Sequence, residues 1–363
     1  MDNQLVEATD INAVFAPPNG DRTLPRLWGR HTILSGVATL ALLAVLATFV
    51  DWQSLWREFL LCQKGYILLG AGCHYLTYPL RGLRWRHCLN HLPIRGSRTK
   101  FGLVVFFYNF VDNLVPAKLG DLYAAHMARI NFGIRRSEAM GSIVFLRMLD
   151  AWIILSVALL VSLTLFSTRL PNSILWALVG GGLIASGATA IMVVFFFLHR
   201  SLPGWVPEKL REVIQSFRKG MWPRPSEIIP IGLLTVLIWG LETLWIVSLV
   251  LAFGLRLSSA EAIFVTMVPL LASAFPLTPS GTGAVELTLF SCLRVVGVSA
   301  PLAVSLTVVN RFIDYWLHIG LGLLTWAMRR MIGLRAWREA VPEDVRTATS
   351  PETALSQEAF HGT

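Results

Sequence analysis

Long apolar runs separated by short polar segments dominate the chain. Six of them are each about 20 residues or longer: 33–50, 66–83, 137–166, 174–198, 228–253 and 301–328. At a rise of 1.5 Å per residue, about 20 apolar residues in a helix cross the roughly 30 Å hydrocarbon layer of a bilayer. The pattern therefore predicts an all-α polytopic membrane protein with about six transmembrane helices.

Two pairs of shorter apolar runs interrupt this series. The first pair is 101–110 and 119–130, and the second is 260–277 and 282–296. The segments DNLVPAKLGD and PLTPSGTG separate the members of each pair, and their prolines and glycines end helices. Because most of these runs are too short to cross, we expect two pairs of re-entrant half-helices that enter the membrane and turn back.

Basic residues gather at the ends of the apolar runs. The chain has 31 Lys and Arg against 22 Asp and Glu, a formal net charge of +9. The basic clusters lie near residue 26, in 81–100, 129–136 and 199–227, and after 328. The positive-inside rule then predicts both termini and these loops on the cytoplasmic side. We expect the membrane to be a bacterial cytoplasmic (inner) membrane. Since topology accounts for the clusters, we expect no nucleic-acid partner.

A spaced motif indicates an internal repeat. It is a glycine followed 27 or 28 residues later by Arg-x-x-Asp, and it occurs at Gly120, Arg147 and Asp150 and again at Gly283, Arg311 and Asp314. The third predicted span runs outward and the sixth runs inward, which predicts an inverted-topology repeat, as in many secondary transporters. The expected divisions are a mobile N-terminal tail, a first membrane repeat, a second inverted repeat and a cytoplasmic C-terminal tail: 1–30, 31–170, 171–330 and 331–363.

The arginines of this motif are expected near mid-membrane. Arg147 lies roughly 14 Å into its span, where a charge costs about 2.5 kcal/mol or more. Asp150, at i+3, shares its helix face and should neutralise it in part. The same holds for Arg311 and Asp314. Two interpretations stay open: a structural ion pair, or a polar cavity in which the arginine exchanges its carboxylate for a substrate phosphate.

The two breaker segments are candidate anion sites. A helix that begins after such a turn presents N–H groups and a positive dipole end. The tip residues expected to contribute are Lys118, Gly120, Asp121, Gly281, Gly283 and Glu286. Simple helix termination is the alternative.

Further ionisable groups lie within or beside the predicted spans. Glu242, Glu286 and His318 are candidates for proton coupling or for packing, and we interpret His74 as a packing residue. The spacing of the four cysteines predicts no metal site. We expect no cofactor, no catalytic residue and no enzymatic activity.

Several motifs together resemble the lysylphosphatidylglycerol synthase transmembrane-region family, also called the flippase-like domain family. They are RGLRWRHCL, YNFVDNLVPAKLGDLYAA, FLRMLDAW, FPLTPSGTGAVE and NRFIDYWLHIGLG, and they cover roughly 35–330. The resemblance implies a membrane domain that moves lipids, with relatives linked to hopanoid transport or lipid-linked glycans. It supports Arg84, Trp85, Pro116, Gly120, Arg147, Asp150, Pro279, Gly281, Gly283, Glu286 and Arg311 as family positions.

The sequence departs from the family pattern in its first half. Asp121 stands where the family commonly has Glu, Ala124 where it has Arg, and Leu146 where it favours Glu. No soluble aminoacyl-transfer domain is expected after Arg338. The predicted function is therefore a flippase for an anionic or amphiphilic lipid. The alternatives are a membrane-embedded enzyme or an accessory subunit acting on lipid phosphates, and we expect lipid-biosynthesis enzymes or a second copy of the chain as partners.

Overall fold

The computed structural model describes residues 52–95, 97, 99–114, 119–166, 172–198, 207–272, 281, 283–329 and 331–334. Within these ranges the protein is helical and contains no strand, so the all-α prediction is confirmed there. The predicted first span, 33–50, and the predicted N-terminal tail lie outside the described residues.

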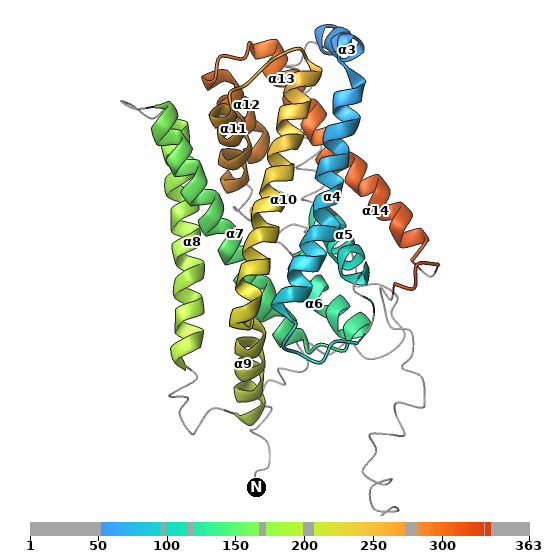
Figure 1. Ribbon diagram of the computed structural model, residues 1–363, viewed down its shortest axis with the longest axis vertical. Helices are drawn as coiled ribbons and strands as arrows, with labels where there is room; N and C mark the ends of the chain where they lie inside the picture. The colour runs from blue at the N-terminus through green and yellow to red at the C-terminus, as the bar shows by residue number, and fades with distance from the viewer. Residues whose placement is uncertain are drawn as a thin grey trace, which may run out of the picture.

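Four long helices form the frame of the molecule (Figure 1). They are α4 (Lys64–Cys88), α7 (Arg136–Leu165), α8 (Asn172–Leu198) and α10 (Pro225–Ala252). By length and composition, α7, α10 and the 174–194 part of α8 are apolar enough to cross a membrane. Helix α4 packs along α10 over much of its length. The count of six spans stays a prediction.

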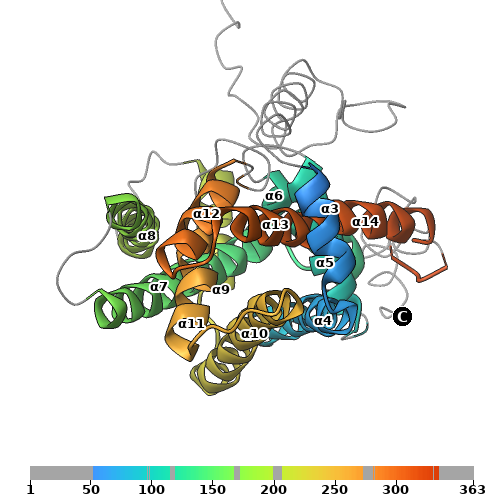
Figure 2. The same ribbon diagram turned by 90° about the horizontal axis from the view of Figure 1, so that it is seen from above.

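The last predicted span is one helix with a π-helical turn in its middle. It consists of α13 (Ala300–Arg311), the π segment η2 (Phe312–Leu317) and α14 (His318–Ala327). Figures 1 and 2 show this rod running obliquely across the molecule. The apolar pattern predicted the helix but not the π turn, a feature that often marks functional sites.

Two pairs of short helices lie at opposite ends of the frame. Helices α5 (Thr99–Leu114) and α6 (Leu119–Phe132) pack together, as do α11 (Ser259–Ala272) and α12 (Ala284–Val295). The second pair lies at the upper end in Figure 1, as does α3 (Trp52–Leu61), and the first pair lies in the lower part. The four predicted short helices are present, while their entry into a membrane stays a prediction.

A helix occupies part of the segment expected to be an interior loop, 199–227. Helix α9 (Glu208–Met221) packs against the first turns of α7. Its Ile214 and Met221 are buried, and at Gly220 a Cβ atom would collide with the carbonyl of Glu138. The loop prediction was therefore wrong over α9, because charged residues on its outer face concealed the apolar positions that face α7.

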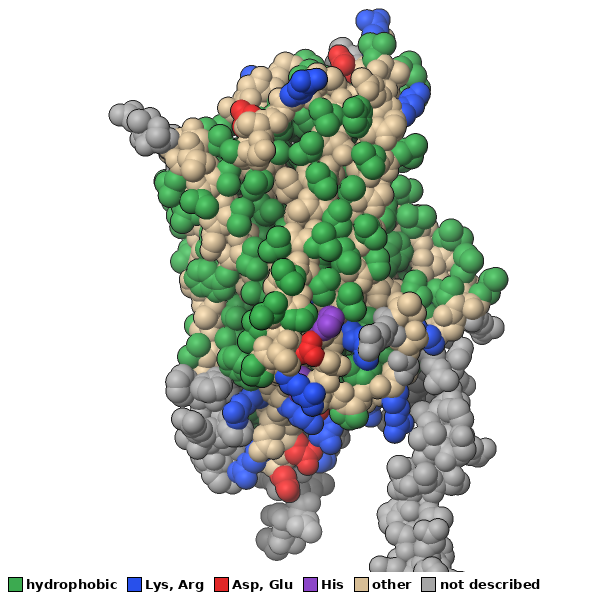
Figure 3. All heavy atoms as spheres, viewed as in Figure 1, with side chains coloured by type: hydrophobic (Ala, Val, Ile, Leu, Met, Phe, Trp, Pro, Cys, Tyr) green, Lys and Arg blue, Asp and Glu red, His purple; other side chains and the backbone are tan. Residues whose placement is uncertain are grey.

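The buried apolar side chains form two clusters, one around each short-helix pair. One surrounds α11 and α12 and includes Phe264 and Leu306. The other surrounds α5 and α6, where the rings of Phe101 and Phe132 stack with centroids 3.8 Å apart. On the face shown in Figure 3, hydrophobic side chains cover the middle and charged ones gather toward the two ends. Such a band is what a bilayer requires of a membrane protein.

Candidate functional site

The ionisable side chains predicted at mid-span lie where one apolar cluster gives way to the other. Along α4 the change falls between Ile67 and Tyr78, and along α7 between Leu146 and Ile154. We call the ionisable side chains at this boundary or within about two helical turns of it the polar layer: His74, Arg81, Arg84, Arg147, Asp150, Glu242, Arg311, Asp314 and His318. They come from α4, α7, α10 and the last helix, so the layer joins segments far apart in sequence.

Arg84 and Asp150 form the most buried ion pair of the layer. The two guanidinium Nη atoms of Arg84 donate to the two carboxylate oxygens of Asp150 at 2.6 and 2.8 Å. Arg84 also donates to the hydroxyl of Thr235, and the indole N–H of Trp239 donates to Asp150. This pair therefore holds α4, α7 and α10 together.

The expected pairing of Arg147 with Asp150 was wrong. The bidentate fork of Arg84, from another helix, satisfies both oxygens of Asp150 better than an i,i+3 neighbour can. Arg147 instead donates to Asp121 at 2.9 Å and lies 3.7 Å from Asp112. Its side chain is 40% exposed.

The first arginine site thus joins α7 to the tip of the α5–α6 pair. Asp112 lies in the last turn of α5 and accepts a hydrogen bond from the backbone N–H of Gly120 at 3.1 Å, which ties α5 to the start of α6. Asp121 lies in the first turn of α6, where a carboxylate suits the helix dipole. Lys118 and Pro116 lie outside the described residues.

The second arginine site repeats this arrangement with other residues. Arg311 at the end of α13 contacts Glu286, in the first turn of α12, at 2.7 Å. Glu286 also accepts the backbone N–H of Gly283 at 2.6 Å. Asp314 lies 4.0 Å from Arg311, as the i,i+3 spacing predicted, although Glu286 is the closer partner.

Tyr315 of η2 links the second site to the first. The guanidinium of Arg311 lies 4.2 Å from the centroid of its ring, within cation–π range. Its hydroxyl donates to the backbone carbonyl of Asn113 at 3.0 Å, and Asn113 is the neighbour of Asp112. The first breaker segment is therefore connected through one side chain to the arginine of the second site.

The glycines of the second breaker adopt backbone conformations that require glycine. Gly281 has φ 67° and Gly283 has φ 93°. Residues with a Cβ rarely take such angles and glycine takes them readily, so glycine suits both positions of the turn into α12. Pro279 lies outside the described residues.

Glu242 of α10 is bound by three side chains of α4. His74 contacts it through Nδ1 at 2.9 Å, Arg81 donates to it at 3.0 Å, and Thr77 donates at 3.3 Å. Sequence reasoning missed His74 and Arg81 here. The sequence signal that could have found them is Glu242, because a carboxylate inside a predicted span needs a hydrogen-bond donor or cation as its partner.

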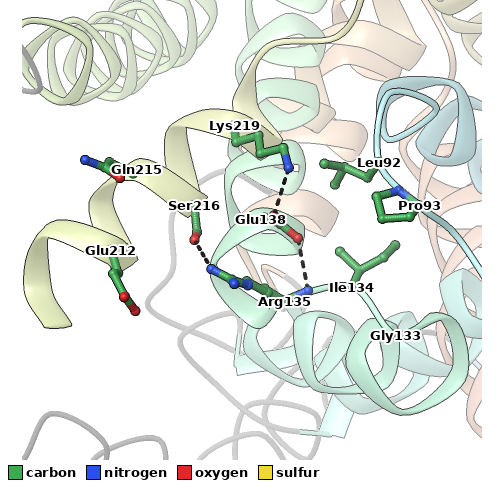
Figure 4. A pocket seen from close by; sticks show the side chains of 10 residues that line it. All are labelled: Leu92, Pro93, Gly133, Ile134, Arg135, Glu138, Glu212, Gln215, Ser216 and Lys219. Carbon is green, nitrogen blue, oxygen red and sulfur yellow. Dashed lines mark hydrogen bonds and ion pairs between the residues drawn. The ribbon is translucent and has the colours of Figure 1, made fainter. Parts of the chain in front are cut away.

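A pocket of about 510 Å³ opens at the α9 end of the molecule (Figure 4). Arg135 donates to Ser216 at 3.2 Å across it, and Lys219 lies 3.9 Å from Glu138. Its lining contains none of the predicted site residues. This pocket is therefore separate from the polar layer.

The family model for the lysylphosphatidylglycerol synthase TM region matches residues 32–322. The chain belongs to this family. The match spans both short-helix pairs and the polar layer described above, and the resemblance inferred from the motifs is confirmed. As a member of this family it is an integral membrane protein.

Several curated proteins are similar to this family member. A UPF0104 membrane protein of Methanocaldococcus jannaschii is 26% identical over 57% of this chain and 88% of its own length. A second, from Methanothermobacter thermautotrophicus, is 22% identical over 81% of this chain and 94% of its own length. No solved structure matches the chain.

A third relative corrects one expectation. Glycosyltransferase AglD of Haloferax volcanii is 24% identical over 77% of this chain, and the match covers 51% of AglD. The prediction of no enzymatic activity is contradicted, because a protein that shares most of this chain's length is named as an enzyme.

Proposed function

We propose that this chain moves an anionic or amphiphilic lipid, such as a phospholipid, a hopanoid or a polyprenyl-linked lipid, across the membrane. The observation that carries the proposal is Arg147, which is 40% exposed although it lies mid-helix in a span. Its partners Asp121 and Asp112 sit on a separate pair of short helices. A lipid phosphate can replace those carboxylates at the planar guanidinium fork.

The two arginine sites support an inverted repeat as the framework for this movement. In each, a carboxylate in the first turn of a short helix binds an arginine about 25 residues later, on a long helix. The two short-helix pairs lie toward opposite ends of the molecule (Figure 1). Such paired broken helices around a central site are typical of transporters that alternate access between two sides.

The proposed setting is the bacterial inner membrane with both termini in the cytoplasm. The α9 end, with Arg95, Arg135 and Lys219, then faces the cytoplasm, as the positive-inside rule favours. Lipid-biosynthesis enzymes would supply or use the lipid, and a homodimer is the proposed assembly.

Reconstitution into vesicles tests the proposal. A fluorescent phosphatidylglycerol, reduced from outside by a membrane-impermeant reductant, reports how much lipid changes leaflet. We expect wild type to move the lipid and both Arg147→Ala and Arg311→Ala to slow it at least tenfold. Arg147→Lys should also be slow, since an ammonium has no bidentate fork.

The control is Arg57→Ala, because Arg57 is exposed on α3 and belongs to neither site. It should move lipid at the wild-type rate. If Arg147→Ala and Arg311→Ala also moved lipid at that rate while folding normally, the site assignment would be wrong.

The similarity to AglD favours a second candidate, an enzymatic or accessory role in the transfer of sugars to lipids. Vesicles that contain polyprenyl phosphate and a labelled nucleotide sugar test it by chromatography of the lipid fraction. A labelled glycolipid formed by wild type would favour this role. Lipid movement without any labelled product would favour transport.

A further inference from the structure

Two buried histidines from opposite parts of the chain lie against the same two tyrosines. The ring centroid of Tyr78 is 5.7 Å from that of His74 and 4.9 Å from that of His318. Tyr75 lies 5.2 and 6.2 Å from the same two imidazoles. His74 belongs to α4 and His318 begins α14, so this cluster joins the two proposed repeats.

The hydrogen bonds of His74 fix which of its nitrogens carries the proton. Its Nδ1 contacts the carboxylate of Glu242, which can only accept and which Arg81 also binds. Nδ1 therefore carries hydrogen, and in the neutral ring Nε2 is an acceptor. In the described part of the chain this Nε2 is buried and bonded to no protein group.

His318 likewise has one nitrogen in a hydrogen bond and one without, but here Nε2 is the bonded atom and Nδ1 the unbonded one. Its Nε2 lies 3.2 Å from the backbone carbonyl of Phe106, another group that only accepts, so Nε2 carries hydrogen. Nδ1 is then an acceptor, and it too is buried without a bond to any described protein group. Buried polar atoms are normally bonded, and here two imidazole acceptors of one cluster each keep a lone pair that no described protein group uses.

We propose that His74 and His318 form a proton relay that couples lipid movement to the flow of protons, with His74 as the proton-binding site. This inference rests on the proposed function. A proton from water on one side of the membrane binds the Nδ1 lone pair of His318 and is transferred through an intervening water molecule to Nε2 of His74. After the lipid has moved, Nε2 releases this proton to water on the other side. One proton is taken up and one released, and no bond between heavier atoms changes.

The surroundings explain why His74 is the site that holds the proton. The imidazolium of His74 would lie beside the carboxylate of Glu242, whereas the bonded neighbour of His318 is a neutral carbonyl. The charged and titratable groups facing the cluster are Glu242, Arg81, Asp314, Tyr75 and Tyr78. Asp314 also reaches Arg311, so the cluster adjoins the second arginine site.

Two substitutions remove the proton acceptor and keep the existing hydrogen bond. In His74→Asn the amide nitrogen replaces Nδ1 and can still donate to Glu242. In His318→Gln the amide nitrogen replaces Nε2 and can still donate to the carbonyl of Phe106. His87 provides the matched control, because its Nδ1 binds Glu227 at 2.7 Å near the end of α4. His87→Asn is the corresponding variant.

The test compares lipid movement in vesicles of phosphatidylethanolamine and phosphatidylglycerol with and without an imposed pH gradient. We expect the gradient to accelerate wild type and His87→Asn at least fivefold. His74→Asn and His318→Gln should lose this acceleration while keeping the rate seen without a gradient. A wild-type rate that ignores the gradient, or variants that keep the acceleration, would overturn the relay and leave the proposed function standing.

The protonation of His74 can also be measured directly, which tests the relay even if wild type moves no lipid or a variant does not fold. Purified wild type labelled with nitrogen-15 at histidine is titrated by NMR from about pH 9 to 5, where imidazoles ordinarily change charge. We expect the His74 signal to take up a proton at Nε2 while His318 stays neutral. A His74 ring that keeps its neutral signals throughout would overturn the relay, whatever the vesicles show.

Discussion

The two arginine sites share a plan but differ in exposure. The side chain of Arg147 is 40% exposed and has two carboxylates at 2.9 and 3.7 Å. The side chain of Arg311 is 9% exposed, lies 2.7 Å from Glu286 and is covered by the ring of Tyr315. The difference teaches that one arginine is enclosed by its own protein groups while the other keeps part of its side chain exposed, as the proposed binding of a lipid phosphate requires.

The short-helix pairs also differ in how they are held. Helix α5 crosses α4 backbone against backbone, because a Cβ atom at Gly82 would collide with the peptide nitrogen of Gly102. Helix α11 meets α8 through a side chain, Leu271 against Gly181. A side chain such as Leu271 can adjust by changing its rotamer, whereas two helix backbones in contact have no such adjustment. We therefore expect the α4–α5 contact to be the stiffer of the two.

The largest expected effect comes from Arg311→Ala. Removal of this buried partner leaves Glu286 without its counter-charge, and such losses cost about 3–5 kcal/mol. We expect a corresponding drop in the free energy of unfolding in detergent, measured by denaturant titration. Glu286→Gln with Arg311→Ala should recover part of the loss. A single variant as stable as wild type would show that the second site is as open as the first.

A somewhat smaller effect is expected for Gly82→Ala. The added methyl group meets backbone atoms of α5, and overpacking of this kind costs about 1–3 kcal/mol. Gly72→Ala on the same helix is the control, since its Cβ would have no neighbour within 4 Å. That change should be neutral or stabilise by up to about 1 kcal/mol. Equal stabilities of the two variants, by the same titration, would contradict a stiff α4–α5 contact.

The smallest effect on stability is expected for Arg147→Ala. A partly exposed ion pair contributes about 1 kcal/mol or less, so the variant should unfold close to wild type. Its lipid movement should nevertheless fall in the vesicle assay described above. A loss of stability as large as that of Arg311→Ala would remove the distinction between the two sites.

Much of the helical framework could be predicted from the sequence. The apolar runs indicated α7, α8 and α10 almost to their ends, because lipid requires long continuous apolar segments. The breaker segments likewise indicated the short helices. Helix α9 was missed because few apolar positions are enough to bury one face against α7.

The pairing of charges could be predicted only within one helix. The i,i+3 spacing correctly predicted that Asp314 lies near Arg311. It wrongly predicted Arg147 as the partner of Asp150, which instead binds Arg84, 66 residues away in sequence. The sequence indicated that Arg84 mattered but not which acid it binds. Partners on other helices depend on crossing geometry, which periodicity does not contain.

The Gly82–Gly102 crossing also determines how α5 can move. Because the two backbones meet in the first turn of α5, a rotation of the helix about this contact would disturb the packing less than a slide along α4. Asp112 stands ten residues further on, a lever arm of about 15 Å. A rotation of about 10° would then move its carboxylate by roughly 2–3 Å, enough to lengthen its 3.7 Å separation from Arg147 beyond ion-pair range. A small rotation at one glycine contact would therefore part Asp112 from the guanidinium and leave Asp121, at 2.9 Å, as its remaining carboxylate partner.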